Sequence, residues 1–126
     1  MPIHQSITIK ASPTKVYAAI TSADQFSKVT GSAADISNDE GGPFSCFDGQ
    51  IVGRHIELLP NERIVQAWRV KMWPEGVYSI VKFDLSHAND ATTLELAQAG
   101  YPDGMEEHLT PGWHKMYWEP LKSYLE

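Results

Sequence analysis

Histidine and cysteine side chains could carry catalysis or bind a metal, but their spacing in this chain favours neither. His108 and His114 are six residues apart, which on an α-helix turns one about 240° from the other and places them on different faces. They are therefore not the i, i+4 pair of a zinc-binding helix. Cys46 is the single cysteine, so no second thiol can complete a disulfide, and we expect a partly buried strand residue. We predict no metal and no cofactor.

Phosphate-binding and nucleophilic motifs are also missing. Gly41 and Gly42 are not followed by the lysine of a phosphate-binding loop, and no serine stands in the sequence of a nucleophile elbow. Asp103, Glu106 and Glu107 precede the last predicted helix, where carboxylates favour the positive end of the helix dipole. We therefore predict no catalytic residue and favour a protein that is not an enzyme.

Composition and charge narrow the class of protein. The 126 residues are 42% hydrophobic and 21% charged, which is typical of one soluble globular domain, here residues 1–126. Ten Lys and Arg against sixteen Asp and Glu give a net charge of −6, and the basic residues are scattered. Nucleic-acid binding is not expected. No signal peptide or membrane span is evident, so we expect a cytoplasmic protein that does not bind membranes.

The elements that must position any site follow from periodicity and turn residues. The segment IHQSITIK alternates as a strand, Ser12 and Pro13 begin a helix, and a second short helix covers Ala23 to Lys28. Short strands near NDEGG and DG come next. Four longer strands are then predicted, over Gln50 to Leu59, Arg63 to Met72, Tyr78 to Ser86 and Thr92 to Gln98. A last helix is predicted with Thr110 as its cap, Pro111 at its first position and a kink at Pro120.

The period of two along the strands predicts which side chains face inward. The inward sets are Ile64, Gln66, Trp68, Val70; Ser79, Val81, Phe83, Leu85; and Thr92, Leu94, Leu96, Gln98. Polar groups in an apolar wall are typical of a ligand pocket, but buried amides also often satisfy backbone groups. Gly53 indicates a bulge that shifts the strand phase, and we favour His55 inward.

Trp68 and Trp73 flank a short basic stretch that ends in Pro74 and Gly76. Trp68 belongs to the inward face, whereas Trp73 falls at the turn. We expect Trp73 to be a lid or a contact surface rather than part of the core.

Four segments, GGPFSCFDG, ELLPNERIVQAWR, WPEG and GWHKMYWEPLKSYLE, occur in this order. From Ser12 to the last residue they resemble the C-terminal domain of the activator of the heat-shock protein 90 ATPase and the small bacterial proteins built on that domain. The resemblance implies an α+β fold of the START-like, or helix-grip, class. In that fold, a curved antiparallel sheet of about six or seven strands wraps around a long C-terminal helix, with two short helices after the first strand.

The same resemblance implies a cavity between sheet and helix, with Trp68, Phe83, Trp113 and Tyr117 as its walls. Trp68 and Trp113 could equally be solid core. The full set of predicted cavity residues is Trp68, Gln66, His55, Ser79, Val81, Phe83, Leu94, Gln98, Trp113 and Tyr117, with Trp73 and Tyr101 at the cavity mouth or on an interaction surface.

Three functions remain open from the sequence. The first is a non-enzymatic protein that binds a small apolar or amphipathic ligand. The second is an accessory of a heat-shock protein 90 chaperone, although the resemblance assigns the main stimulating contacts to a separate N-terminal domain. The third is an enzyme using His55 or an acidic group at the cavity mouth. We expect a monomer or a weak homodimer.

Overall fold

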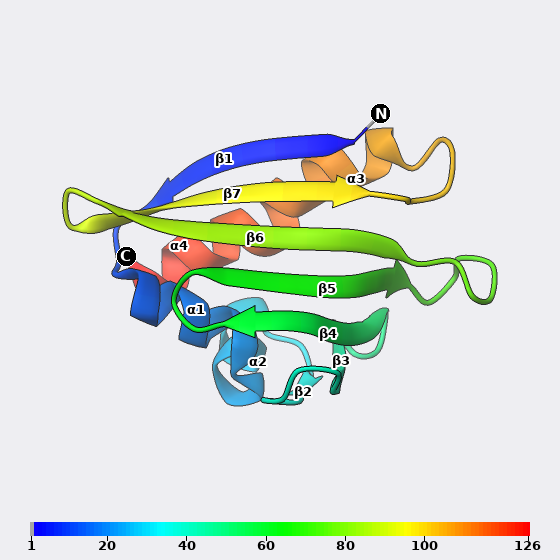
Figure 1. The fold of residues 1–126 in the computed structure, drawn as a ribbon, viewed down its shortest axis with the longest axis horizontal. Helices are drawn as coiled ribbons and strands as arrows, with labels where there is room; N and C mark the ends of the chain where they lie inside the picture. Colours follow the sequence, from blue (N-terminus) through cyan, green and yellow to red (C-terminus); the bar gives the residue numbers. More distant parts are fainter. Residues whose placement is uncertain (1) are drawn as a thin grey trace.

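The computed structural model describes residues 2–126 and contains one antiparallel sheet of seven strands in the order β1-β7-β6-β5-β4-β3-β2 (Figure 1). The strands are β1 Ile3–Ile9, β2 Asp35–Ile36, β3 Pro43–Cys46, β4 Ile51–Leu59, β5 Arg63–Val70, β6 Ser79–Ala88 and β7 Ala91–Ala99. Strands β3 to β7 follow one another as a meander, and β7 pairs with β1. The predicted α+β helix-grip fold is confirmed.

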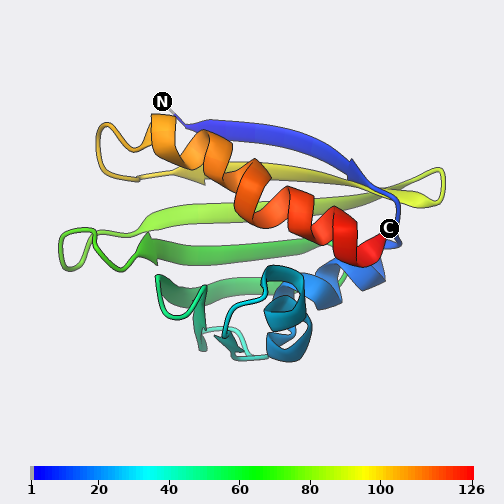
Figure 2. The ribbon, with the colours of Figure 1, turned by 180° about the vertical axis from the view of Figure 1, so that it is seen from behind.

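The helices all lie on one side of the sheet. Two short helices, α1 Pro13–Thr21 and α2 Ala23–Thr30, follow β1. Three consecutive segments, α3 Glu106–Gly112, the π-helical η1 Trp113–Trp118 and α4 Glu119–Leu125, form one long C-terminal helix. Figure 2 shows that helix crossing the sheet diagonally, with α1 and α2 beside its C-terminal end.

Local sequence explains where the first two helices begin and end. The Ser12 hydroxyl accepts a hydrogen bond from the Lys15 amide (3.3 Å) with Pro13 next in the chain, as predicted for a helix start. Ser22 caps α2 in the same way, through the amide of Gln25 (3.3 Å). Gly31, in the left-handed region, ends α2 two residues beyond the predicted Lys28.

The start of the C-terminal helix differs from the prediction. The helix begins at Glu106, so Thr110 is not its cap and Pro111 lies inside α3. Two acidic residues, Glu106 and Glu107, occupy the first turn and favour this earlier start. Leu109 also packs against the core, which gives the added turn an apolar contact.

Proline 120 is associated with a π-helical turn. Its ring would clash with the carbonyl of Met116, and it has no N–H to donate. The helix widens just before it, because the Glu119 amide bonds to the carbonyl of His114, five residues back. This wide turn lets the adjacent Tyr117 and Trp118 both face the sheet. The prediction was a kink at Pro120, and the structure has a π-helical segment just before it.

The inner face of the sheet follows the predicted period of two. Ile64, Val81, Phe83 and Leu94 have no exposed side-chain surface, and the helix covers them. One detail is wrong: the bulge lies between His55 and Glu57 rather than at Gly53. His55 still faces inward, as predicted.

Gly53 is required for a different reason. A Cβ atom at this position would collide with the carbonyl oxygen of Ala67 and with the ring of Phe44. Glycine therefore lets β4 and β5 approach closely at this point.

Candidate functional site

The polar side chains on the inner face form one hydrogen-bonded chain. The Trp113 indole N–H donates to Gln98 Oε1 (2.8 Å), and Gln98 Nε2 donates to the Ser79 hydroxyl (3.1 Å). Ser79 in turn donates to the Trp68 carbonyl (2.8 Å). Buried polar groups were expected either to contact a ligand or to hydrogen-bond within the protein. The structure supports the second alternative for Gln98 and Ser79, because their polar atoms bond to other residues of the fold.

Aromatic rings fill most of the space between sheet and helix. Trp113 lies at the centre, with ring centroids 4.4 Å from Tyr117, 5.3 Å from Trp68 and 5.8 Å from Phe83. Trp118 stacks on Trp113 at 5.6 Å. Sequence reasoning left open whether these tryptophans are core or cavity wall, and both descriptions apply, because Trp68 and Trp113 also border a pocket.

Trp73 was expected outside the core, and this was wrong. Its side chain is only 8% exposed and its ring packs edge-on against Trp68 at 5.8 Å. The turn folds back because the Trp73 amide bonds to the Val70 carbonyl (3.0 Å). Arg69 also donates to the carbonyls of Pro74 and Val77, both at 3.1 Å, and so holds the loop. Tertiary packing thus overrides the turn position of Trp73.

A pocket of about 330 Å³ lies between the first half of the C-terminal helix and strands β4 and β5. Its walls are mostly aromatic and aliphatic, and its polar side chains come from the loop after α2, the start of β4 and the helix. The lining residues are Ser32, Phe47, Gln50, Ile51, Trp68, Val70, His108, Leu109, Gly112, Trp113, Met116 and Tyr117. Its volume is at the lower end of the range for small-molecule sites.

Three of the predicted cavity residues border this pocket, namely Trp68, Trp113 and Tyr117. Gln66 and Phe83 border a second, inner cavity of about 10 Å³ instead. The structure brings the other predicted residues to neither space: Val81, Leu94, Ser79 and Gln98 are packed core, and His55 lies on β4 against Phe44.

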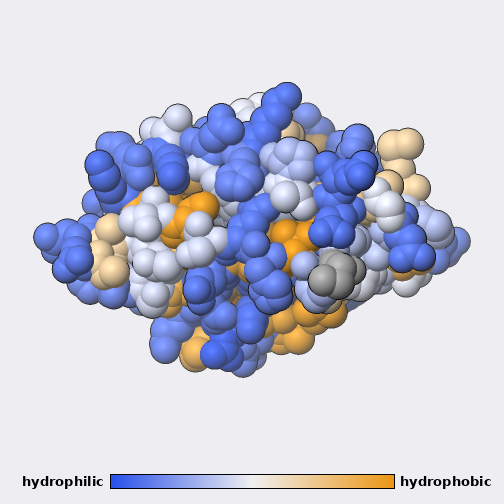
Figure 3. All heavy atoms as spheres, turned by 90° about the horizontal axis from the view of Figure 1, so that it is seen from above, coloured by the Kyte–Doolittle hydropathy of each residue, from blue (hydrophilic) through white to orange (hydrophobic). Residues whose placement is uncertain are grey.

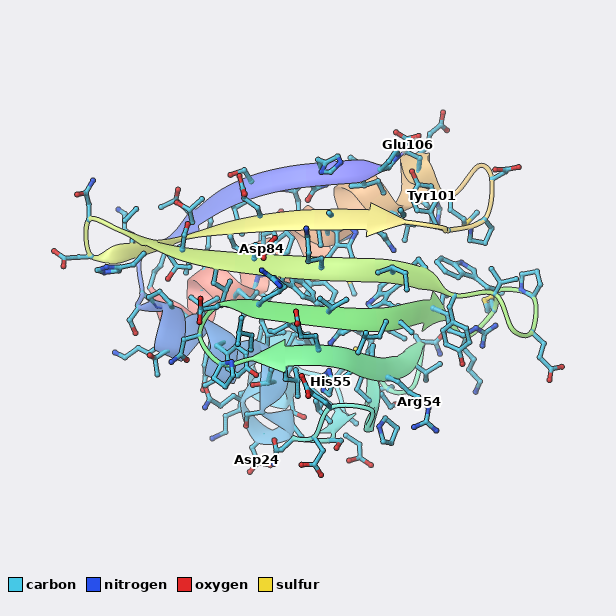
Figure 4. All side chains as sticks on the ribbon, viewed as in Figure 1. Asp24, Arg54, His55, Asp84, Tyr101 and Glu106 are labelled. Carbon is cyan, nitrogen blue, oxygen red and sulfur yellow. The ribbon has the colours of Figure 1, made fainter. Side chains whose placement is uncertain are left out.

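His55 is buried without good hydrogen-bond partners on either ring nitrogen. Its ring stacks on Phe44 with centroids 5.6 Å apart, and Figure 4 places it on β4. Burial lowers the pKa of His55, and the nearby backbone of Ser37 offsets part of that effect. His55 lines neither the pocket nor the small inner cavity described above.

Tyr101 was predicted at the cavity mouth or on an interaction surface, and the second of these stays a prediction. It is partly buried against the core where β7 leads into α3, and Figure 4 shows it near Glu106. Partial burial, and then the Glu106 carboxylate, raise the pKa of the Tyr101 hydroxyl. It does not border the pocket.

Several pocket residues were not in the predicted set. Val70 stood in the predicted inward set of its strand, and Ile51 shares a face with His55, so the strand period could have assigned both. Phe47 carried no such signal, because it lies in the β3–β4 turn with a positive φ of 54°. Met116 and Leu109 depend on the helix rotation, which the misplaced helix start obscured.

The polar atoms beneath the pocket floor are uncharged. The Trp68 indole N–H donates to the Tyr117 hydroxyl (3.3 Å), which lies 3.9 Å from the Cys46 sulfur. Burial raises the pKa of Tyr117 well above its usual value and raises the pKa of Cys46 to about 12. Neither group is a nucleophile at neutral pH.

Residues 2–126 contain no cluster of three or more His, Cys, Asp or Glu side chains able to hold a metal. No helix in the same range has the length and apolar character needed to cross a bilayer.

The family model for activator of Hsp90 ATPase homolog 1-like proteins matches residues 10–126, almost the whole chain. The chain belongs to this family. Among its relatives, the activator of 90 kDa heat shock protein ATPase homolog 2 of Mus musculus is 34% identical over 112 residues. The human homolog 1 is 32% identical over 115 residues, or 91% of this chain. The chain spans about a third of the length of these relatives (34%).

Solved structures of related proteins share the complete fold. An HSP90 activator from Plasmodium falciparum superposes with a TM-score of 0.93 at 26% identity, covering 99% of this chain and 96% of that one. A Chromobacterium violaceum protein gives 0.82 at 25% identity, with the same two coverages. An Aha1 dimer from Colwellia psychrerythraea, at 24% identity and a TM-score of 0.80, supports the fold alone.

Proposed function

We propose that this activator of Hsp90 ATPase homolog 1-like protein binds a small, mainly apolar molecule in the pocket beside Trp68 and Trp113. The observation that carries the proposal is the pocket itself, which remains open although aromatic rings fill the rest of the interior. A well-packed core leaves few voids larger than a water molecule. A space of about 330 Å³ with an apolar lining therefore favours binding.

The ligand should be short and should have one polar end. A volume of about 330 Å³ limits the ligand to a small molecule. The indole N–H groups of the floor are already used, because Trp68 donates to Tyr117 and Trp113 donates to Gln98. The polar end would face Ser32, Gln50 or His108.

Filling the pocket from within tests this proposal. Val70→Phe places a ring in the pocket, whereas Val65→Phe adds the same ring to the opposite face of β5. The protein and both variants would be isolated gently from the native host and examined by native mass spectrometry, before and after denaturing extraction. We expect an extra mass on wild type and on Val65→Phe but not on Val70→Phe. Equal retention by both variants would rule out this pocket.

A second function, assistance to a heat-shock protein 90 chaperone, is favoured by a different observation. Relatives 32–34% identical to this chain are named activators of that chaperone's ATPase, and the superposed Plasmodium falciparum protein is described as an HSP90 activator. The apolar side chain with the greatest exposure among those noted on the surface is Met72, at 86%, on the loop that Arg69 holds. An exposed apolar side chain on a hydrogen-bonded loop is suited to a protein contact.

The chaperone function is tested with the host's heat-shock protein 90. Binding by titration calorimetry and a change in ATPase rate are expected for wild type. Both should weaken for Met72→Glu, but not for Tyr124→Glu, which alters an exposed residue on α4. Absence of binding at high micromolar concentration would refute this function.

Location and assembly belong to the same proposal. A chaperone accessory would act in the cytoplasm as a monomer or a weak homodimer, which fractionation and sedimentation velocity would measure. Figure 3 shows hydrophobic residues as separate patches between polar ones on the face that carries β1 and α3, which supports no extensive apolar interface there. A stable dimer at nanomolar concentration would contradict this assignment.

A further inference from the structure

Two voids lie under the C-terminal helix, and Tyr117 is the one described residue that borders both. The outer void is the pocket of about 330 Å³. The inner void, about 10 Å³, is bordered by Phe26, Cys46, Gln66 and Phe83 among others, and has room for about one water molecule. The side chain of Tyr117 therefore separates a ligand-sized space from a small one deeper in the core.

Tyr117 is held firmly in this position. Its side chain is 5% exposed, and its hydroxyl accepts a hydrogen bond from the Trp68 indole at 3.3 Å. Its ring lies between Trp113 on the pocket side, at 4.4 Å, and Phe26 on the inner side, at 5.5 Å. The π turn of η1 directs it toward the sheet together with Trp118. A side chain fixed on several sides acts as a wall rather than as a mobile lid.

Phe47 completes the partition. Its ring borders the pocket and packs against Phe26 at 5.7 Å and Tyr117 at 5.4 Å. A phenylalanine with φ of 54° is unusual and is retained only where surrounding contacts hold it. Asp48, next in the chain, provides such contacts, because its carboxylate accepts the Ala33 amide (2.8 Å) and its own amide donates to the Ala33 carbonyl (3.1 Å).

We propose that Tyr117 is the end wall of the ligand pocket and sets the greatest ligand length that this protein accepts. The inference rests on the ligand-binding function proposed above and adds the ligand class: an unbranched or single-ring apolar body with one polar end. Replacing Tyr117 with a smaller side chain joins the pocket to the inner cavity, so longer members of the same class then fit. Cys46 and Gln66 become the new end of the joined space.

The experiment uses straight-chain primary alcohols, from butanol to dodecanol, and measures affinity by titration calorimetry with tryptophan fluorescence as a second readout. For wild type we expect about a fourfold gain in affinity with each added methylene, up to a limiting length. Beyond that length the gain stops, because further methylenes find no apolar space. In Tyr117→Ala and Tyr117→Leu the gain continues to longer alcohols.

Two controls separate the wall from other effects. Tyr117→Phe keeps the ring and removes the hydroxyl, so its limiting length should equal that of wild type. Phe26→Leu enlarges the inner cavity while Tyr117 stays in place, so its limit should also be unchanged. Circular dichroism establishes that each variant is folded, and Tyr117→Leu replaces Tyr117→Ala if the alanine variant unfolds.

The outcomes distinguish this inference from the function on which it rests. A wild-type protein that binds no alcohol contradicts the proposed ligand-binding function. If the affinity of wild type keeps rising with alcohol length up to dodecanol, Tyr117 is not an end wall, but the proposed ligand-binding function stands. This result needs no folded variant. The same conclusion about Tyr117 follows if the limiting length is equal in wild type and in the smaller Tyr117 variants, or if Phe26→Leu extends it. The proposal is supported if Tyr117→Ala and Tyr117→Leu have a longer limiting length than wild type and the other variants do not.

Discussion

Burial of His55 disfavours a positive charge on its imidazole ring. The ring is 1% exposed, it stacks on Phe44, and neither of its nitrogens has a good hydrogen-bond partner. A proton on this ring would place an unpaired charge inside the protein, so folding keeps the imidazole neutral and lowers its pKa. The unfolded chain has no such constraint and takes up a proton near the ordinary value of 6.5.

This difference predicts a stability that falls in acid. Below about pH 6.5 the unfolded state binds one proton more at His55 than the folded state, so the free energy of unfolding decreases as pH falls. The slope from this residue is at most about 1.4 kcal/mol per pH unit. Urea unfolding at several pH values would measure it. His55→Gln should flatten the slope and the exposed His87→Gln should not; equal slopes in wild type and His55→Gln would contradict this account.

The burial of individual strand side chains could be predicted from the sequence, but their contacts could not. A period of two was enough to predict that Gln66, Ser79 and Gln98 face inward, and all three are buried. It could not predict that Gln98 bonds to Trp113, because that contact depends on the rotation of a distant helix. It also could not place Trp73, whose burial depends on the hydrogen bonds that fold its loop back.

Among elements, two glutamines join the sheet to the C-terminal helix in similar ways. Gln98, on β7, accepts from the Trp113 indole and is fully buried. Gln5, on β1, accepts from the Trp118 indole (2.7 Å) and donates to the Thr110 carbonyl (2.9 Å) at the partly exposed edge. The two glutamines differ mainly in exposure: if the side-chain amide is removed, water can take over its hydrogen bonds at Gln5 but not at Gln98.

Leucine at each position should therefore have different costs. Gln98→Leu leaves the Trp113 N–H buried without an acceptor, and we expect the free energy of unfolding to fall by about 2–3 kcal/mol. Gln5→Leu should cost about 1 kcal/mol or less, because water reaches that edge. Denaturant titration would measure both values. Equal losses of unfolding free energy in the two variants would show that the buried Gln98–Trp113 hydrogen bond stabilises the protein no more than the Gln5 hydrogen bonds do.

A second prediction for the elements concerns two glycines. Gly53→Ala places a methyl group against the Ala67 carbonyl, so β4 and β5 must separate, and we expect a loss of about 3 kcal/mol. Gly112→Ala meets no atom within 4 Å inside the long helix and should stabilise the protein by up to about 1 kcal/mol. Thermal unfolding followed by circular dichroism would compare them. A tolerated Gly53→Ala would contradict the close approach of these strands.

Element identity was easier to predict than element boundaries. Alternation and turn residues predicted both early helices and the strands, since these signals are local. The helix start was wrong because Thr110 and Pro111 form a strong local signal that the packing of Leu109 and the acidic first turn override. The register of the π turn, which places Tyr117 and Trp118 on one face, has no comparable local signal.

For the whole molecule, a shared core predicts one cooperative unfolding transition. Helix α1, all the longer strands and the C-terminal helix contribute to a single cluster that includes Val16, Ile64 and Leu121. We therefore expect residues 1–126 to behave as one domain, with equal calorimetric and van't Hoff enthalpies. Differential scanning calorimetry measures both values. Two separable transitions would contradict the single-domain prediction.

The pocket marks the limit of prediction at this scale. Resemblance to the family was enough to predict the fold and a space between sheet and helix. The size of that space depends on how Phe47, Trp113 and Tyr117 pack together, and a small rotation of any ring would change it. No local sequence pattern predicts the volume that remains between these rings.

The position of the long helix in the chain also has a consequence for protein synthesis. Trp113, Trp118 and Leu121 cover the inner face of the sheet, yet they leave the ribosome only after all seven strands. At typical elongation rates, the interval between the end of β7 at Ala99 and the arrival of Leu121 is about one to four seconds. During that interval only α1 and α2 can cover the apolar face of the nascent sheet, so the unfinished chain is more prone to aggregation than the chain that includes the C-terminal helix.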